Sequence, residues 1–179
     1  MGGILRVFEK VLEIVKSNEI RWVLAGSLAS YFNGLNVKPK DIDILTNKDG
    51  VQSFYNLIKN YCTVKRIPEY SETDLYASFY SKYSCDGTNI EIMGNFKLKT
   101  SMGVIDIPFE KIWELSNAHQ INSIEFKVIP LELQLIYNIF IPGKEERVNL
   151  TLQHFRENPP NSHIVKELKK FVNTDIWKI

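Results

Sequence analysis

The sequence predicts an α+β fold, with a mixed β-sheet flanked by helices and a C-terminal helical segment. Apolar residues recur at helical spacing over residues 3–17, and short apolar or alternating runs separated by turn residues fill residues 20–129. From Pro130 onward the spacing is helical again. We therefore expect an α/β-type core at residues 1–129 and a helical segment at residues 130–179 that packs on or beside it.

The composition is that of an ordinary soluble globular protein. Lys and Arg number 22 and Asp and Glu 21, so the formal net charge of +1 gives no global field that would attract nucleic acid. Cys62 and Cys85 lack a zinc-ligand spacing and are expected to be free thiols. The N-terminal residues lack the apolar region of a signal peptide, and no apolar run approaches the ~20 residues that cross a bilayer. We expect a cytoplasmic protein with no membrane partner.

The first elements follow from apolar spacing and turn chemistry. The helix over residues 3–17 turns its apolar stripe toward the sheet, and Trp22–Ala25 is an apolar run of strand length. Gly26 permits a sharp turn and the close approach of a ligand. Ser27 is a good N-cap for a short helix over Leu28–Asn33.

The middle of the chain predicts further strands around one helix. Asp41–Leu45 is a second strand, and a helix over Val51–Asn60 follows it with Asp49 as the expected N-cap. Asp86-Gly87 is a strong hairpin turn, and Ile67–Thr73, which contains a proline, is expected to be a loop. We expect further strands over residues 62–65, 74–83, 89–93, 97–100, 104–107 and 124–129.

The C-terminal part is predicted to be helical. Residues 109–117 are expected to form a helical turn or an irregular segment. Pro130 is tolerated where a helix begins, and Pro142-Gly143 breaks that helix. The expected helices cover residues 131–140, 144–157 and 162–171.

Asp41 and Asp43 are the sharpest chemical feature of the sequence. Residues two apart in a strand point to the same face, and two neighbouring carboxylates repel each other unless a cation lies between them. Carboxylate oxygens with open positions suit Mg²⁺, which also binds substrate phosphates. In the alternative interpretation, Asp41 caps a strand end and Asp43 faces solvent. The Gly26-Ser27 turn at this spacing favours the metal site.

Two other positions complete the predicted site. A helix that begins after Gly26 presents free N–H groups and a partial positive charge, which suits a triphosphate. Glu91 lies between Ile90 and Ile92 in an apolar strand, where a charge needs a reason. The alternative for Glu91 is a solvent-facing side chain on a half-exposed strand, and Asp86 is a rival that suits its turn better.

These residues together resemble the signature of the nucleotidyltransferase superfamily that includes DNA polymerase beta. The chain looks most like the small prokaryotic branch, near the minimal, lincosamide-type and AbiEii-like nucleotidyltransferases. The resemblance implies that Gly26 and Ser27 hold the nucleotide phosphates and that Asp41 and Asp43 hold two Mg²⁺ ions. It also implies that Glu91 is the third carboxylate, which binds metal or accepts the proton of the attacking hydroxyl.

The resemblance further implies a Mg²⁺-dependent enzyme that moves a nucleoside monophosphate from an NTP, with ATP the expected donor, to an acceptor hydroxyl and releases pyrophosphate. Lys38, Lys40, Lys144 or Arg147 are then candidates for neutralising the phosphates. The chain departs from the branch at Asn138, where a lysine is common, and in the slots before the Asp pair. The acceptor stays open among a small molecule, tRNA and protein.

Two further functions follow from the same residues. The chain could be the toxin of a toxin–antitoxin pair that acts on tRNA or protein, with an antitoxin partner. It could instead be a non-catalytic nucleotide-binding protein that keeps the fold. Small members of this group often have too little wall to enclose a substrate, so a homodimer or a partner chain is also expected. The three histidines, His119, His154 and His163, are scattered and are assigned no chemistry.

Overall fold

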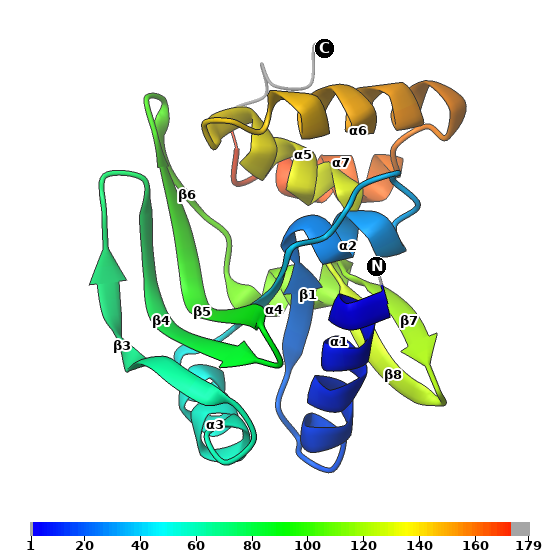
Figure 1. Cartoon of the computed structure of the whole chain (residues 1–179). Helices are drawn as coiled ribbons and strands as arrows, with labels where there is room; N and C mark the ends of the chain where they lie inside the picture. Colours follow the sequence, from blue (N-terminus) through cyan, green and yellow to red (C-terminus); the bar gives the residue numbers. More distant parts are fainter. Residues whose placement is uncertain (1, 173–179) are drawn as a thin grey trace.

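A computed structural model describes residues 2–172 of the chain (Figure 1). Within these residues one mixed sheet of eight strands runs in the order β3-β4-β5-β2-β1-β8-β7, and β6 pairs with β5. The strands are β1 (Trp22–Ala25), β2 (Asp41–Thr46), β3 (Thr63–Glu72), β4 (Tyr76–Cys85), β5 (Thr88–Thr100), β6 (Gly103–Asp106), β7 (Asn117–Ile121) and β8 (Ile124–Val128). The α+β prediction is confirmed.

Seven helices flank the sheet in the described part of the chain. They are α1 (Gly2–Val15), α2 (Gly26–Phe32), α3 (Lys48–Ile58), α4 (Phe109–Leu115), α5 (Leu131–Phe140), α6 (Glu145–Glu157) and α7 (Ser162–Leu168). In Figure 1, α5, α6 and α7 gather beyond the end toward which β1 points, beside α2, whereas α1 and α3 lie lower against the sheet. No helix among residues 2–172 is long and apolar enough to cross a membrane.

Strand β2 lies at the centre of the sheet between β1 and β5. It runs antiparallel to β1, where Ala25 is opposite Asp43, and parallel to β5, where Asp43 is opposite Glu91. Partners in register on neighbouring strands point to the same face of a sheet. The pairing therefore brings the carboxylates of two strands, 48 positions apart in the sequence, to one face.

The opposite face of the same strands forms the core. Ile42 and Ile44 alternate with the two aspartates and are fully buried, on the face that α1 covers. Phe8 of α1 is also fully buried, and its ring lies edge-on to those of Trp22 and Phe126 at centroid distances of 6.3 and 5.1 Å. Burial of aromatic side chains is a large source of stability, so this layer holds the aspartate face in place.

Several local predictions are wrong in instructive ways. The N-cap of α3 is Asn47, whose side chain accepts a hydrogen bond from Gly50 N, and Asp49 lies inside the first turn. The segment 67–73, expected to be a loop, belongs almost entirely to β3. Its proline is accommodated because β3 is an edge strand whose pairing with β4 is irregular between Arg66 and Glu69, so the missing N–H breaks no regular ladder.

Three further differences concern lengths and one missed strand. β5 is a single strand from Thr88 to Thr100, where two separate strands were expected. β7 (Asn117–Ile121) was not predicted; its exposed, polar residues pair with β8 at the sheet edge and show little apolar alternation. Most of the segment 109–117 forms the helix α4, which ends at Leu115. The helices α5, α6 and α7 lie close to their expected positions.

Candidate active site

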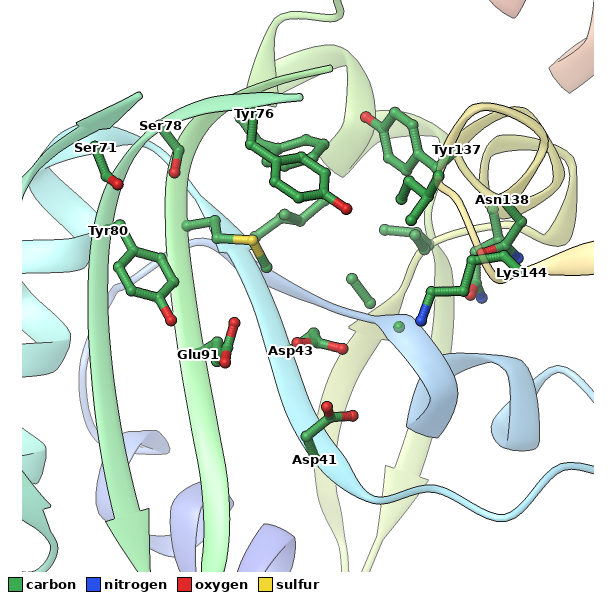
Figure 2. A pocket seen from close by; sticks show the side chains of 18 of the residues that line it. Asp41, Asp43, Ser71, Tyr76, Ser78, Tyr80, Glu91, Tyr137, Asn138 and Lys144 are labelled. Carbon is green, nitrogen blue, oxygen red and sulfur yellow. The ribbon is translucent and has the colours of Figure 1, made fainter. Parts of the chain in front are cut away.

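A cavity of about 420 Å³ lies on the aspartate face of the sheet, a size typical of small-molecule sites. Its floor is formed by β2 and β5, one wall by β3 and β4, and the other by the Gly26 turn, α5 and the start of α6 (Figure 2). Asp41, Asp43, Glu91 and Gly26 all line it. The structure therefore brings together the carboxylates and the glycine that were singled out in the sequence.

Gly26 is required here by a close approach of the backbone to Asp43. Its φ is +64°, in the region that favours glycine, and an added Cβ would lie 1.8 Å from Asp43 Oδ2. The sequence predicted close approach of a ligand at this position. The structure shows in addition that the glycine makes room for the Asp43 carboxylate of β2.

Ser27 does not cap helix α2, although the sequence predicted that it would. Helix α2 begins at Gly26, its N-cap is Ala25, and no side chain caps it. Ser27 is 1% exposed and its Oγ donates to Asp41 Oδ1 at 3.2 Å. The Ser27 hydroxyl therefore orients the Asp41 carboxylate. The two side chains meet because the turn packs against β2.

The carboxylates affect one another electrostatically. Burial raises the pKa of Asp43 to about 7, with further contributions from Asp41 and Glu91, while Arg147 and Lys144 act in the opposite direction. A buried carboxylate beside two others is stabilised by a cation, so Asp41 and Asp43 fit Mg²⁺, which commonly takes one or two carboxylates together with substrate phosphates.

Glu91 is already engaged by strand β4. Lys82, its register partner, donates to Glu91 Oε1 at 2.6 Å. Burial and then the Glu91 carboxylate raise the pKa of Tyr80, which lies beside Glu91 in Figure 2. Within residues 2–172 no three His, Cys, Asp or Glu side chains are grouped closely enough to hold a metal ion. This arrangement therefore suits a metal ion bound by Asp41 and Asp43 better than one bound by all three carboxylates.

The four basic residues proposed from the sequence to neutralise phosphates differ in whether they line the cavity. Lys144 and Arg147, at the start of α6, line the cavity. Lys38 and Lys40, in the segment between α2 and β2, are exposed and lie outside the cavity lining. Sequence spacing could not separate the four because α6 is brought to the site by tertiary packing, which includes its contacts with α5.

Gln134 and Ser30 are site residues that the sequence analysis missed. Ser30 Oγ lies 2.9 Å from the Gln134 side chain, and with its amide nitrogen toward the turn Gln134 donates to Gly26 O at 2.8 Å. Both residues are buried, at 0% and 3% exposure. The available signal was a glutamine within a mostly apolar helix, since a buried amide needs partners.

The β3–β4 wall of the cavity is rich in hydroxyl groups. Ser71 and Thr73 contribute from β3 and its end, and Tyr76, Ser78 and Tyr80 from β4. Figure 2 shows Tyr80 next to Glu91, with Ser71 and Ser78 above them, across the cavity from Asn138 and Lys144. The two walls therefore present different chemistry on either side of Asp43.

Comparison with known protein families decides the assignment. A family model described as aminoglycoside-2''-adenylyltransferase matches residues 7–153, which include every carboxylate of the cavity. The chain belongs to this family. The resemblance to the nucleotidyltransferase superfamily is thereby confirmed, and the family member is an enzyme of the class that transfers nucleoside monophosphates.

The fold of this family member agrees with that of a solved structure. A Thermotoga maritima protein, named as a candidate nucleotidyltransferase, is 24% identical, with a TM-score of 0.68 over 87% of this chain and 92% of that one. A Helicobacter pylori protein named in the same way is 19% identical, with a TM-score of 0.45 over 91% of this chain and 74% of that one. No curated protein sequence matches the chain.

Proposed function

We propose that this family member is a Mg²⁺-dependent nucleotidyltransferase that moves a nucleoside monophosphate from an NTP, with ATP the expected donor, to an acceptor hydroxyl. The single observation that carries the proposal is the pair Asp41 and Asp43 on one face of β2, against the Gly26 turn, in a cavity of about 420 Å³. Cationic side chains also line this cavity, Lys144 and Arg147 at the start of α6 and Arg66 on β3, as suits a triphosphate.

Asp41 and Asp43 would hold Mg²⁺, with Ser27 fixing the orientation of Asp41. When bound, the metal supplies charge neutralisation for the phosphates and acidifies the acceptor hydroxyl. The Gly26 turn offers backbone groups to the phosphates, and Lys144 and Arg147 neutralise their charge from α6. This arrangement assigns Lys38 and Lys40 a secondary role, at the outer surface.

Glu91 would accept the proton of the acceptor hydroxyl, because it lies beside Asp43 in register and faces the β3–β4 wall. The acceptor oxygen then bonds to the α-phosphorus, the bond from that phosphorus to the bridging oxygen breaks, and pyrophosphate leaves. Lys82 donates to Glu91 Oε1 at 2.6 Å and fixes the position of this carboxylate. Metal binding by Glu91 requires exchange of this partner, so the base role is favoured.

The test begins with calorimetric titration of ATP in the presence and absence of Mg²⁺. We expect Mg²⁺-dependent binding that the double variant Asp41→Ala, Asp43→Ala abolishes. Asp86→Ala is the control, since Asp86 is an exposed turn carboxylate outside the cavity. Undiminished Mg²⁺-dependent binding in the double variant would contradict the proposal.

Transfer itself is measured with ATP labelled at the α-phosphate, an acceptor panel that includes small molecules, tRNA and protein, and mass determination of the product. ATP binding without pyrophosphate release would indicate a non-catalytic nucleotide-binding protein instead. Growth arrest on expression that a neighbouring small protein relieves would indicate a toxin. Sedimentation of the purified chain tests the expected homodimer.

We also propose a cytoplasmic location. The thiols of Cys62 and Cys85 are free and buried, which suits a reducing compartment.

A further inference from the structure

The cations of the cavity differ in whether a carboxylate already neutralises them. Lys144 and Arg147 line the cavity from the start of α6, and neither forms an ion pair within residues 2–172. Arg66, the cation on the β3–β4 wall, is paired with Glu69. The unpaired cations are the better partners for phosphate oxygens, so the pyrophosphate part of the donor belongs on the α6 side of the carboxylates.

The acceptor belongs on the opposite side of Asp43. Glu91 is its register partner on β5 and lies toward the β3–β4 wall (Figure 2). The attacking and leaving oxygens of phosphoryl transfer lie roughly in line through the phosphorus. With the pyrophosphate toward α6 and the acceptor hydroxyl at Glu91, the ribose of the donor leaves this line sideways, along the direction of β2. It can therefore point toward Asp41 or away from it.

The two ends of the cavity along β2 differ in polarity. Figure 2 shows Asp41 at one end, and Tyr76 and Tyr137 at the other. Leu45 and Met93 line the cavity on the way to the tyrosines, as register partners two positions beyond the neighbouring carboxylates, or about 7 Å along the strands. A flat, uncharged nucleobase fits this apolar end better than the carboxylate end.

Aromatic rings close the apolar end. The Phe96 ring contacts those of Tyr76 and Tyr137, at centroid distances of 5.7 and 5.4 Å, and all three residues line the cavity. Phe96 and Tyr137 are buried, whereas Tyr76 is half-buried. Bases of any kind stack on aromatic side chains, so this cluster is complementary to the base of the donor.

Asn138 lies between the aromatic end and the cations of α6. Figure 2 shows its side chain between those of Tyr137 and Lys144, and on α5 it is one helical turn after Gln134, which contacts Gly26 O. Asn138 lines the cavity and is 7% exposed. Within residues 2–172 its side-chain amide has no hydrogen-bond partner. A buried amide needs partners, and here a bound molecule can supply them.

We propose that Asn138 recognises the ribose hydroxyl groups of the donor while the base lies at the aromatic end. The ribose joins the base to the triphosphate, just as Asn138 lies between Tyr137 and Lys144 on the cavity wall. An amide both donates and accepts hydrogen bonds, as hydroxyl groups do. The inference rests on the proposed function, because it takes an NTP bound at Asp41 and Asp43 as its starting point.

The test is calorimetric titration, in the presence of Mg²⁺, of ATP and of 2′,3′-dideoxy-ATP, which lacks both ribose hydroxyl groups. We expect the unmodified chain to bind ATP about 10-fold more tightly than the dideoxy form. Asn138→Leu keeps the size of the side chain without its polar atoms. It should weaken ATP binding about 10-fold and change the affinity for the dideoxy form less than about 2-fold. Asn149→Leu, at an exposed position of α6 outside the cavity lining, is the matched control and should keep the preference.

A second titration tests the place of the base. Ribose 5′-triphosphate has the sugar and the phosphates of ATP but no base. Tyr76→Leu removes the ring and keeps an apolar side chain, so it should weaken ATP binding about 5-fold and ribose 5′-triphosphate binding less than about 2-fold. Tyr70→Leu is the control, because Tyr70 is exposed outside the cavity lining. Equal weakening of both ligands by Tyr76→Leu would overturn the placement of the base.

Equal affinity of the unmodified chain for ATP and its dideoxy form would overturn the role of Asn138, and this measurement does not depend on the folding of any variant. An unchanged preference in Asn138→Leu, shown to be folded by thermal unfolding, would do the same. In both cases Mg²⁺-dependent ATP binding, and the proposed function with it, would stand. Absence of Mg²⁺-dependent ATP binding in the unmodified chain would instead overturn the proposed function and the inference together.

Discussion

The two walls of the cavity differ in how firmly the fold holds them. The Gly26 turn is enclosed by buried groups, with Asp43 against its α-carbon and Gln134 at its carbonyl oxygen. The opposite wall ends at β3, an edge strand with irregular pairing and mostly exposed residues. Rigid packing protects the side proposed to bind metal and phosphate, where small displacements are costly, while side chains on an edge strand can change without disturbing the sheet.

Gly26→Ala should break the rigid wall and produce the largest effect. The new Cβ would overlap Asp43 Oδ2 at a position with positive φ, so the carboxylate must move. We expect nucleotidyl transfer to fall at least ~100-fold, as misplaced catalytic groups typically cause. Steady-state rates measure this loss. Gly87→Ala is the matched control, because Gly87 also has positive φ but has open space around it; equal loss in both variants would refute the explanation.

The pH dependence of stability tests the electrostatics of the same wall. Because the folded-state pKa of Asp43 is raised from 3.8 to about 7, the folded chain binds a proton between these values that the unfolded chain does not. The free energy of unfolding of the metal-free protein should therefore fall as pH rises from 5 to 7, by about 2–3 kcal/mol from this group. Urea unfolding at each pH measures it. Asp43→Asn should flatten the profile, whereas Asp86→Asn should not.

Gln134→Leu should loosen the turn without removing a carboxylate. The substitution leaves the buried Gly26 carbonyl and Ser30 hydroxyl without this partner, which costs about 1–3 kcal/mol of stability. Chemical denaturation measures the loss, and ATP binding should weaken with it. Gln153→Leu, on an exposed position of α6, is the control. Full stability in Gln134→Leu would show that the turn is held by other contacts.

Lys144→Ala tests whether the lysine that lines the cavity contributes more to ATP binding than the exposed lysines. Lys144 lines the cavity, whereas Lys40 is exposed outside it. We expect Lys144→Ala to weaken Mg²⁺-dependent ATP binding about 10-fold, consistent with loss of one charge-assisted contact of about 1.5 kcal/mol. Calorimetric titration measures the change. Lys40→Ala should alter binding less than about 2-fold, and a reversed order would return the phosphate role to the α2–β2 segment.

The smallest effect is expected on the edge-strand wall. Ser71 lines the cavity, but its neighbour Tyr70 is 57% exposed and donates to Glu72 outside the lining. Ser71→Ala should raise the KM for the acceptor about 3-fold, through loss of one neutral hydrogen bond, with the affinity for ATP unchanged. Tyr70→Ala should change neither quantity. A larger effect from Tyr70 would mean that this tyrosine stacks on a substrate.

The part of the site formed by β1, the Gly26 turn and β2 could be predicted because these elements are short and close in sequence. β1 matches the predicted strand from Trp22 to Ala25, and Gly26 and Asp43 were recognised from spacing. The carboxylate of Glu91 was found because a charge between two isoleucines is unusual. The hydrogen bond of Ser27 to Asp41, the place of Lys144 in the cavity and the contact of Gln134 with Gly26 could not be predicted in this way, since each depends on another element.

Alternation and turn residues in the sequence determined the α+β class, the central strands and the pair Asp41 and Asp43 on one strand face. Periodicity is a local property of the sequence, so it can be recognised without knowing which strands pair. Tertiary structure alone decided that Asp43 stands opposite Glu91, that Gln134 closes over Gly26, and that α6 rather than the α2–β2 segment brings cations to the cavity. These outcomes depend on long-range pairing and packing, in which burial and register choose the neighbours that spacing cannot specify.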